Sequence, residues 1–381
     1  MKVVITGDFC PIHRLTSLSG SSDPNSVLNS LIEPIQKADL AITNLECPVT
    51  DAKVPIEKTG PNLRGAPMSL DFLKKAGFNL VTLANNHILD YGKVGLQDTI
   101  QHLQSRDIAY VGAEMNYEAA SIPFMKNDGG ISIAVINVAE NEWSTTDGDF
   151  SGANPIEPIK VFKQISAAKR KVDKVILITH GCHEHYPLPS PRMKEWFRAF
   201  VDMGADAVIN HHTHCVSGYE VYREAPIFYS VGNFLFDHPE KRKDRWNIGS
   251  MVELDISQAV INFEVTYFKQ CEGTATAEVM GKEAGEAFSE YVEELNLIIS
   301  DETKLATEFA DWVTSRRKLY NTYLEPIKSR IVQGLQNRGW FPSLWNDRKR
   351  AYLYNLIRCE SHREAVLHIL KSELRIKSKK S

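Results

Sequence analysis

The sequence lacks the features that mark membrane proteins, secreted disulfide-rich proteins and nucleic-acid-binding proteins. No apolar run approaches the roughly 18–20 residues that span a bilayer. The N-terminus, MKVVITGDF, has a strand pattern rather than the apolar core and cleavage site of a signal peptide. The formal net charge of −4 gives no broad attraction to nucleic acid or anionic lipid. We therefore expect a cytoplasmic protein with no membrane span and no nucleic-acid partner.

Cysteine is also sparse. The chain has 6 cysteines in 381 residues, which is far below the density of a disulfide scaffold. Cys10, Cys47, Cys182 and Cys215 nevertheless lie inside the motifs described below. We interpret them as reduced, partly buried thiols in preference to metal ligands.

The sequence up to about residue 270 alternates short apolar runs with segments of helical period. The runs are KVVITGD, LAITNLE, NLVTLANNH, SIAVINVAE, KVILITHG, AVINHHTH and IFYSVGNF. Amphipathic stretches such as SLDFLKKAG and KEWFRAFVDMGA separate several of them, a pattern that predicts an α/β architecture with helices covering the sheets. MVELDIS and VINFEVTYF leave no room for a helix between them and predict an antiparallel hairpin. The sequence thus favours a mixed sheet or two packed sheets.

A helical region follows the α/β part. From about residue 280 apolar residues recur at helical spacing, and one such stripe is formed by Leu305, Phe309, Trp312, Val313 and Leu319. We predict a chemically active domain over residues 1–270 and a helical C-terminal region over residues 271–381. For the helical region we expect a packing role, in a homo-oligomer or against a biosynthetic partner.

Polar side chains gather where the apolar runs end. These residues are Asp8; Asn44 and Glu46; Asn85, Asn86 and His87; His180, His183, Glu184 and His185; and His211, His212 and His214. Ligands of open α/β sheets bind beyond the carboxyl ends of the strands. We therefore predict that these five strand ends converge on one site.

This mixture of carboxylates, amides and imidazoles suits one or two divalent ions such as Mn²⁺, Fe²⁺, Zn²⁺ or Mg²⁺. Two-metal sites of this kind activate water and clamp a phosphoryl or acyl group. Each motif alone has a simpler interpretation, since NNH is also turn chemistry and Asp8 is also a suitable helix N-cap. Five such coincidences favour the metal site, and so do the six histidines, of 12 in the chain, that lie between positions 180 and 214.

In this order, the motifs resemble the CapA, or poly-γ-glutamate capsule synthesis, family, which is related to the calcineurin-like metallophosphoesterases. The motifs are GDF, NLECPVT, LANNHILDYG, HGCHEHY, GADAVINHHTH and FYSVGNFLFD. The resemblance extends from residue 1 to about 265 and does not include the C-terminal helices. It implies a metallophosphoesterase-like sandwich of two sheets flanked by helices, with the metals at one edge.

Roles for individual residues follow from the resemblance, position by position. The implied metal ligands are Asp8, Glu46 as a bridging carboxylate, Asn86, His180, His212 and His214. His87 is the implied general acid or transition-state contact, and Asp90 is placed to orient its ring. Asp90 is equally well explained as a turn residue before Tyr91-Gly92.

The sequence departs from the family pattern in two places. Metallophosphoesterases have Asp-x-His in the first motif, where this chain has Cys10, so either a thiolate or a weaker second metal site is implied. HGCHEHY keeps Glu184 at the family's spacing from His180 and adds His183 and His185. We assign Glu184 and His183 to catalysis and proton transfer, and His185, Asn44 and Arg64 to substrate binding. Arg64 lies with Lys58 on a Gly/Pro-rich loop, where an Arg suits a phosphate or carboxylate.

Three functions remain open from the sequence. The first is metal-dependent hydrolysis of a phosphoester or amide in an anionic small-molecule, peptide-like or polymer substrate. The second is non-hydrolytic assembly of a γ-glutamyl or capsule-like polymer. The third is epimerase-type acid/base chemistry on a peptide-like substrate. Family members in polymer assembly are usually membrane-anchored, and we expect no membrane span in this sequence. We therefore favour the hydrolase.

Overall fold

The computed structural model describes residues 1–58, 60–146, 148–241, 244–324 and 329–358. The chain divides into two compact units, Met1–Ala306 and a second unit from Thr307 onward. Among the described residues, no helix has both the length and the hydropathy needed to cross a membrane. Each unit is described by itself below.

The first sheet contains eight strands and carries the N-terminal motifs. Its order is β16-β15-β14-β1-β2-β3-β4, and β13 pairs with β1 off this path. The strands are β1 (Lys2–Cys10), β2 (Leu40–Leu45), β3 (Leu80–Thr82), β4 (Ala109–Val111), β13 (Asn233–Phe236), β14 (Ile248–Ile256), β15 (Ile261–Gln270) and β16 (Ala277–Val279). β1 to β4 run parallel, whereas β14 and β15 form the antiparallel hairpin predicted from the sequence.

The second sheet contains six strands in the order β11-β12-β10-β9-β7-β6. They are β6 (Phe124–Asp128), β7 (Ile131–Ala139), β9 (Lys174–His180), β10 (Ala207–His211), β11 (Tyr219–Tyr222) and β12 (Ala225–Phe228). β7, β9, β10 and β12 are parallel to one another. A small antiparallel pair is formed by β5 (Ala113–Glu114) and β8 (Gly152–Ala153).

The two sheets pack face to face because alternate side chains of each are apolar. Val3 and Ile5 of β1 enter the same buried cluster as Ile176 and Ile178 of β9. Successive strand residues point to opposite faces, so Val4, between Val3 and Ile5, joins a different cluster. The inter-sheet cluster is the core of a sandwich, and it fixes how the ends of β1 and β2 meet those of β9 and β10.

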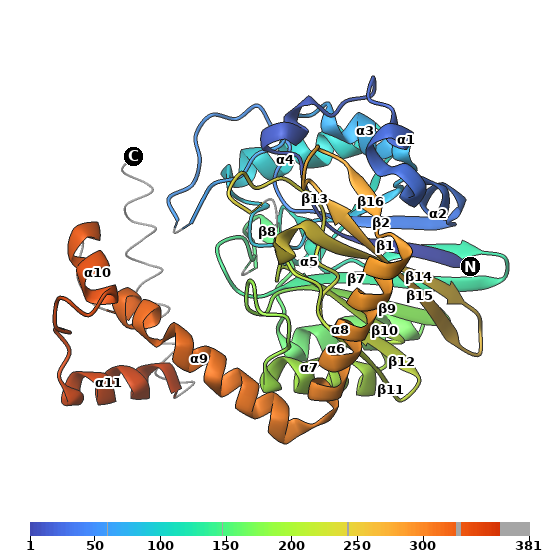
Figure 1. Cartoon of the computed structure of the whole chain (residues 1–381). Helices are drawn as coiled ribbons and strands as arrows, with labels where there is room; N and C mark the ends of the chain where they lie inside the picture. Colours follow the sequence, from blue (N-terminus) through green and yellow to red (C-terminus); the bar gives the residue numbers. More distant parts are fainter. Residues whose placement is uncertain (59, 147, 242–243, 325–328, 359–381) are drawn as a thin grey trace. The chain divides into compact units, whose positions relative to one another are not determined.

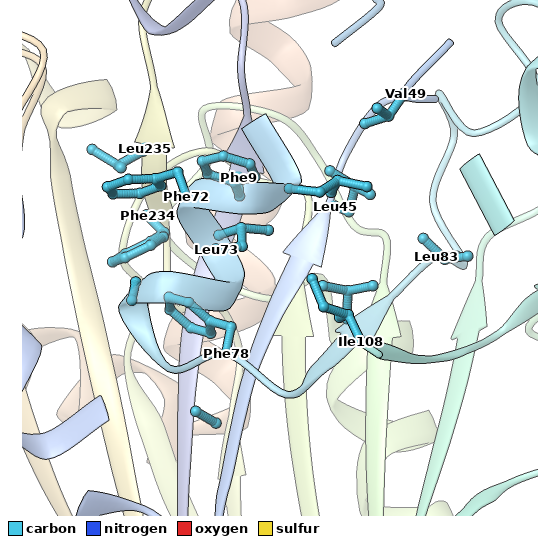
Figure 2. Close-up of a cluster of buried hydrophobic side chains, with 14 of the residues drawn as sticks. Phe9, Leu45, Val49, Phe72, Leu73, Phe78, Leu83, Ile108, Phe234 and Leu235 are labelled. Atoms are coloured by element: carbon cyan, nitrogen blue, oxygen red, sulfur yellow. The ribbon is translucent and has the colours of Figure 1, made fainter. Parts of the chain in front are cut away.

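Helices cover the outer faces of both sheets (Figure 1). On the first sheet lie α1 (Pro24–Leu28), α2 (Ile32–Lys37), α3 (Ser69–Ala76) and α4 (Gly92–Gln104). Figure 2 shows part of the buried cluster between these helices and the first sheet, where Phe72 and Leu73 of α3 lie beside Phe9 and Phe234. The second sheet is covered by α6 (Pro158–Lys169) and α7 (Pro191–Asp202), while the short α5 (Tyr117–Ala120) adjoins β5 and β8.

The two-sheet sandwich flanked by helices is therefore confirmed. From Lys282 on, the described residues form only helices and their connections: α8 (Lys282–Ser300), α9 (Glu302–Leu324), α10 (Arg330–Asn337) and α11 (Asp347–Arg358). This agrees with the predicted helical C-terminal region. Leu305 is buried, Trp312 is half-buried and Val313 is exposed. The side chain of Leu319, the last residue of the predicted stripe, lies outside the described part.

The first compact unit extends past residue 270, where the sequence placed the division. β16 adds a strand to the first sheet after that point, and α8 packs against β11 and β15. Asn296 of α8 accepts a hydrogen bond from the Tyr219 backbone N–H at 2.7 Å. The buried ammonium of Lys194 on α7 donates to the Ile299 carbonyl at the end of α8. α8 thus belongs to the unit that holds the polar strand ends.

The sandwich core gives a direct stability prediction. Ile42 of β2 is fully buried between the sheets, whereas Ile159 of α6 is 73% exposed. We expect Ile42→Ala to lower the free energy of unfolding by about 2–5 kcal/mol, because it removes buried methyl groups and leaves a cavity. The same change at Ile159 is the matched control and should stay within about 0.5 kcal/mol of wild type. Urea unfolding followed by circular dichroism measures both, and equal losses would contradict this placement of β2.

Candidate metal centre

The predicted strand ends meet at one edge shared by the two sheets. Asp8 lies in β1, Asn44 lies in β2, and Glu46 follows β2 directly. Asn86 and His87 follow β3 in the same sheet. From the second sheet come His180, the last residue of β9, and the residues after His211, which ends β10. Parallel strands bring their carboxyl ends to the same edge, and the packed sheets bring two such edges together.

β13 reaches this edge because two glycines let it lie against β1. A Cβ on Gly7 would stand 1.9 Å from the Gly232 carbonyl oxygen, and Gly232 itself has a φ of 70°. The Asp8 backbone N–H donates to that same carbonyl at 3.2 Å. Only glycine fits such a close backbone approach without strain. The SVGNF motif is thereby placed with Asn233 opposite Asp8 in the strand register.

Glu46 occupies the centre of the cluster. Its Oε1 lies 3.6 Å from His180 Nε2 and also 3.6 Å from His214 Nε2. Its side chain is fully buried, and neither carboxylate oxygen has a hydrogen-bond partner among the described residues. Buried polar atoms nearly always have partners, and an orphan pair calls for a missing ligand or ion. Glu46 therefore lies where a cation would supply the missing partner of its carboxylate.

Two groups of ligand atoms share this carboxylate. One contains Glu46, His180 and His212, and the other contains Asp8, Glu46 and His214. In each group the ligand atoms lie within 4.8 Å of one another. Asn86 adds an amide oxygen to the first group, 3.1 Å from His180 Nε2. Imidazole, carboxylate and amide donors of this kind suit Zn²⁺, Mn²⁺ or Fe²⁺.

The protonation tendencies also fit a bound cation. Burial, followed by the neighbouring imidazoles, holds the pKa of His180 well below its ordinary value, and burial does the same to the pKa of His214. Both rings therefore keep the lone pairs that bind metals. Burial and the nearby charge of Asp8 raise the pKa of Glu46 well above its ordinary value. A divalent cation beside Glu46 would offset both causes, so the donor set fits a metal.

A network of buried amides holds these groups in place. Asn44 Nδ2 donates to Asp8 Oδ1 at 2.7 Å and lies 3.3 Å from His180 Nδ1. Asn44 Oδ1 in turn accepts hydrogen bonds from Thr82 at 3.2 Å and from Asn85 at 3.3 Å. Asn44 was predicted to bind substrate, but it is fully buried and its contacts orient Asp8 and His180. Such outer contacts fix the orientation of metal ligands.

His212 and His214 lie on strained backbone, with φ values of 90° and 55°. Non-glycine residues adopt these values only where their surroundings enforce them. His214 Nδ1 lies 2.9 Å from Asn233 Oδ1, and the His214 ring packs on Trp246 with centroids 4.4 Å apart. The His212 backbone N–H donates to Asp8 Oδ2 at 3.3 Å. These contacts turn both imidazoles toward Glu46.

His87 belongs to a separate buried group beside the metal ligands. Its Nδ1 lies 2.7 Å from Asp90 Oδ2, as the predicted orienting role of Asp90 requires. Lys58 forms an ion pair with Asp90 Oδ1, and its Nζ lies 3.1 Å from His87 Nδ1. The side chains of Lys58 and Asp90 are 3% and 0% exposed. The Lys58 ammonium, the Asp90 carboxylate and the His87 imidazole thus contact one another in a buried position.

The remaining predicted residues lie farther toward solvent. His183 is half-buried, whereas Glu184 and His185 are exposed. His185 Nε2 lies 2.7 Å from Lys241 Nζ, and its ring centroid is 6.1 Å from that of His214. His183, Glu184 and His185 therefore lie beside the candidate metal-binding residues, on the side that faces solvent. Arg64 points elsewhere, since its guanidinium donates to the Ala52 carbonyl and lies 5.2 Å from the Tyr91 ring centroid.

Cys10 and His211 belong to neither of the two ligand groups. Cys10 lies in a buried cluster with Cys47, Phe236 and Trp246, and burial raises the pKa of its thiol well above the ordinary value. A protonated thiol in such a cluster acts as a small apolar side chain. His211 Nε2 lies 3.1 Å from the Thr6 carbonyl oxygen of β1. Within the HHTH run, His212 and His214 are the residues that contribute to the two groups.

Several site residues were not assigned from the sequence. Asn233 lay within a recognised motif, and its place after an apolar run was the available signal. Lys58 was noted as a loop cation without a partner. Trp246 lies in a 3-10 helix (Arg245–Asn247) after a charged segment, and no sequence pattern linked it to His214. Glu142 lies 3.7 Å from His212 Nε2, and its place after the apolar run SIAVINVAE was the available signal.

The chain is similar in sequence to bacterial capsule synthesis proteins. The family described as "Bacterial capsule synthesis protein PGA_cap" matches residues 2–238, a range that contains both ligand groups. The capsule biosynthesis protein CapA of Bacillus anthracis is 34% identical over 246 residues, covering 62% of this chain and 60% of that protein. The PGA biosynthesis protein CapA of Bacillus subtilis is 32% identical over 212 residues, covering 54% and 56%. The chain thus spans somewhat more than half the length of these relatives.

More distant similarity is found among solved structures. A hypothetical protein from Thermus thermophilus has a TM-score of 0.46 and 15% identity, covering 71% of this chain and 99% of that one. A 5'-nucleotidase from Candida albicans has a TM-score of 0.42 and 13% identity, covering 80% of this chain and 58% of that one. The sequence match carries the assignment: the chain belongs to the bacterial capsule synthesis protein PGA_cap family.

Proposed function

We propose that this chain is a metal-dependent hydrolase that acts on a phosphoester or amide of an anionic substrate. The observation that carries the proposal is the buried Glu46 carboxylate, which has no hydrogen-bond partner in the described part of the chain and lies 3.6 Å from imidazole nitrogens of two separate ligand groups. One or two divalent ions bound there would polarise the scissile group. They would also lower the pKa of water, so that hydroxide is available to attack near neutral pH.

The residues of the chain divide the remaining work. Asp8, Glu46 and His214 would hold one ion, and His180, His212 and Asn86 would join Glu46 in holding a second. His87 stands beside them, and its Nδ1 lies 2.7 Å from Asp90 Oδ2 and 3.1 Å from Lys58 Nζ. Its Nε2 is therefore the ring nitrogen left to act on the substrate, where it would pass a proton to the leaving group.

The names of the relatives and the exposed residues near the ligands support a proposal for the substrate class. The names of the relatives refer to capsule, PGA and polyglutamine synthesis, which favours a γ-glutamyl or capsule-like chain. Lys241, His185 and His183 place cationic or neutral groups on the exposed side of the site, and such groups suit a carboxylate or phosphate. The cytoplasmic location and a partner for the C-terminal helices stay predictions.

Turnover tests the proposal directly. We expect hydrolysis of an aryl phosphate or of a γ-glutamyl anilide, lost with chelator and restored by Mn²⁺. His87→Gln should lower kcat by roughly 10²–10⁴-fold, since it removes the proton donor, while metal content stays at the wild-type level. His102→Gln, on α4 and outside the site, is the control and should leave kcat unchanged.

Two other results would favour a different function over hydrolysis. Deuterium incorporation from solvent without bond cleavage would establish epimerase-type acid/base chemistry. Binding of a polyglutamate chain without turnover, by protein that contains metal, would establish an assembly role. Either outcome, with no cleavage of phosphoesters or amides, contradicts the proposal.

The raised pKa of Glu46 gives a stability prediction with a defined sign. Because its folded-state pKa lies above the ordinary value, the ionised carboxylate lowers stability at every pH above that pKa, and this cost disappears below the ordinary value. Glu46→Gln removes the cost at all pH values. We expect metal-free Glu46→Gln to be more stable than metal-free wild type near pH 7.5, by about 1–3 kcal/mol.

Thermal unfolding with chelator and with added Mn²⁺ measures this effect. Wild type should gain stability with the metal, and Glu46→Gln should lose most of that gain. The exposed Glu286→Gln on α8 is the matched control and should follow wild type in both conditions. A metal-free Glu46→Gln variant less stable than wild type would show that the carboxylate has a partner in solution.

A further inference from the structure

We propose that Lys58 is a positioning residue for His87: its ammonium fixes the Asp90 carboxylate and thereby holds the His87 ring in one tautomer and orientation. The inference rests on the proposed function, in which His87 acts on the substrate. It assigns a role to the loop between Ala52 and Arg64, whose described residues contribute to neither ligand group.

The burial of Lys58 is the first observation. Its side chain is 3% exposed although it lies on a loop, and its partner Asp90 is fully buried. Lysine almost never occupies such a position without a partner, and an ammonium taken from water requires a compensating charge. The pair is therefore mutually dependent, because removing either residue leaves the other charge buried and uncompensated.

Asp90 organises the loop as well as the imidazole. Its Oδ2 accepts a hydrogen bond from the Leu63 backbone N–H at 2.6 Å, and its backbone carbonyl accepts one from the Ile56 N–H at 2.9 Å. Ile56 and Leu63 thus anchor the loop to Asp90 from both sides of Lys58. The position of the Lys58 ammonium is set by these two anchors.

The contacts of His87 Nδ1 carry the functional step. This nitrogen lies 2.7 Å from Asp90 Oδ2 and 3.1 Å from Lys58 Nζ. A ring nitrogen carries either a proton or a lone pair, whereas a carboxylate only accepts and an ammonium only donates. The two partners therefore require opposite tautomers, and only one of them bonds to Nδ1 at a time.

The shorter contact decides which tautomer is present. The Lys58 ammonium already pairs with Oδ1 of the same carboxylate, which leaves Oδ2 to accept from the ring nitrogen. Nδ1–H then donates to Asp90, and Nε2 carries the lone pair on the side of the ring away from Asp90. Nε2 can then accept the proton that the attacking water loses and pass it to the leaving group, while the Asp90 carboxylate holds the ring, as the carboxylate of a catalytic triad does.

Nitrogen NMR of the imidazole rings tests the tautomer without any assay of turnover. Protein labelled with ¹⁵N in the histidine rings is compared as wild type, Lys58→Met and Lys58→Arg, and His87→Gln assigns the signal. Wild type should show His87 with protonated Nδ1 and unprotonated Nε2. Lys58→Arg should keep this signature, and Lys58→Met, which keeps the length of the stem, should lose it. An unchanged His87 signal in folded Lys58→Met would overturn the proposal.

Kinetics provides the second readout. Lys58→Met should lower kcat by about 10–100-fold, the usual cost of losing such an orienting contact, with KM and metal content close to wild type. Lys58→Ala leaves space for a small amine, and added ethylamine should restore part of kcat if the ammonium matters rather than the loop. If KM rises and metal content falls as much as kcat does, Lys58 has a structural role instead.

The two proposals fail in different ways. Absent hydrolysis by metal-loaded wild type would refute the proposed function, while the NMR comparison would still decide the role of Lys58. Conversely, a second outcome is an active enzyme in which Lys58→Met leaves both the His87 signal and kcat unchanged. That result would support the hydrolase and refute the proposed role of Lys58.

Discussion

The burial of one carboxylate without a partner is the constraint on which the site depends. Glu46 is enclosed by imidazoles and by a second carboxylate, Asp8, and neither of its oxygens accepts a hydrogen bond from the residues that the structure describes. In a metal-free protein this arrangement lowers stability, because burial and like charge both oppose ionisation. We propose that this arrangement binds a cation and that the surrounding amides and strained histidines hold its ligands in place.

The sandwich explains how ligands so distant in sequence come together. Asp8 and Glu46 end neighbouring parallel strands of one sheet, and His180 and His212 follow neighbouring parallel strands of the other. The apolar cluster between the sheets fixes their relative position. β13 adds Asn233 from a third direction, and it reaches β1 because Gly7 lacks a side chain. Packing therefore sets the geometry, and the polar strand ends supply the chemistry.

Much of this arrangement was predictable from the sequence. Apolar runs located the strands, and polar residues at their ends indicated a site there, because a strand has no packing use for such residues. The resemblance to a family then selected Asp8, Glu46, Asn86, His180, His212 and His214 from that larger set. The resemblance to a family supplied the two-sheet sandwich, which periodicity alone did not distinguish from a single mixed sheet.

The rest depended on tertiary contacts that sequence patterns do not encode. Asn44 ends a strand as a substrate-binding residue would, yet its neighbours are Asp8 and His180. Arg64 shares a loop with Lys58, but one side chain turns to Tyr91 and the other to Asp90. Trp246 packs on His214 after a charged segment with no apolar pattern. Side-chain direction on loops is set by packing across the fold, so residue type and position did not reveal it.

The central claim is that Glu46 joins two cation positions, and metal stoichiometry tests it most directly. Elemental analysis after equilibrium dialysis against Mn²⁺ or Zn²⁺ would compare wild type with His180→Ala, His214→Ala and Glu46→Ala, with His183→Ala as the control. The account predicts about two ions per chain for wild type and His183→Ala, about one for each ligand-histidine variant, and a loss of both with Glu46→Ala. A wild-type protein that takes up no divalent metal, or a Glu46→Ala variant that keeps its full content, would contradict it.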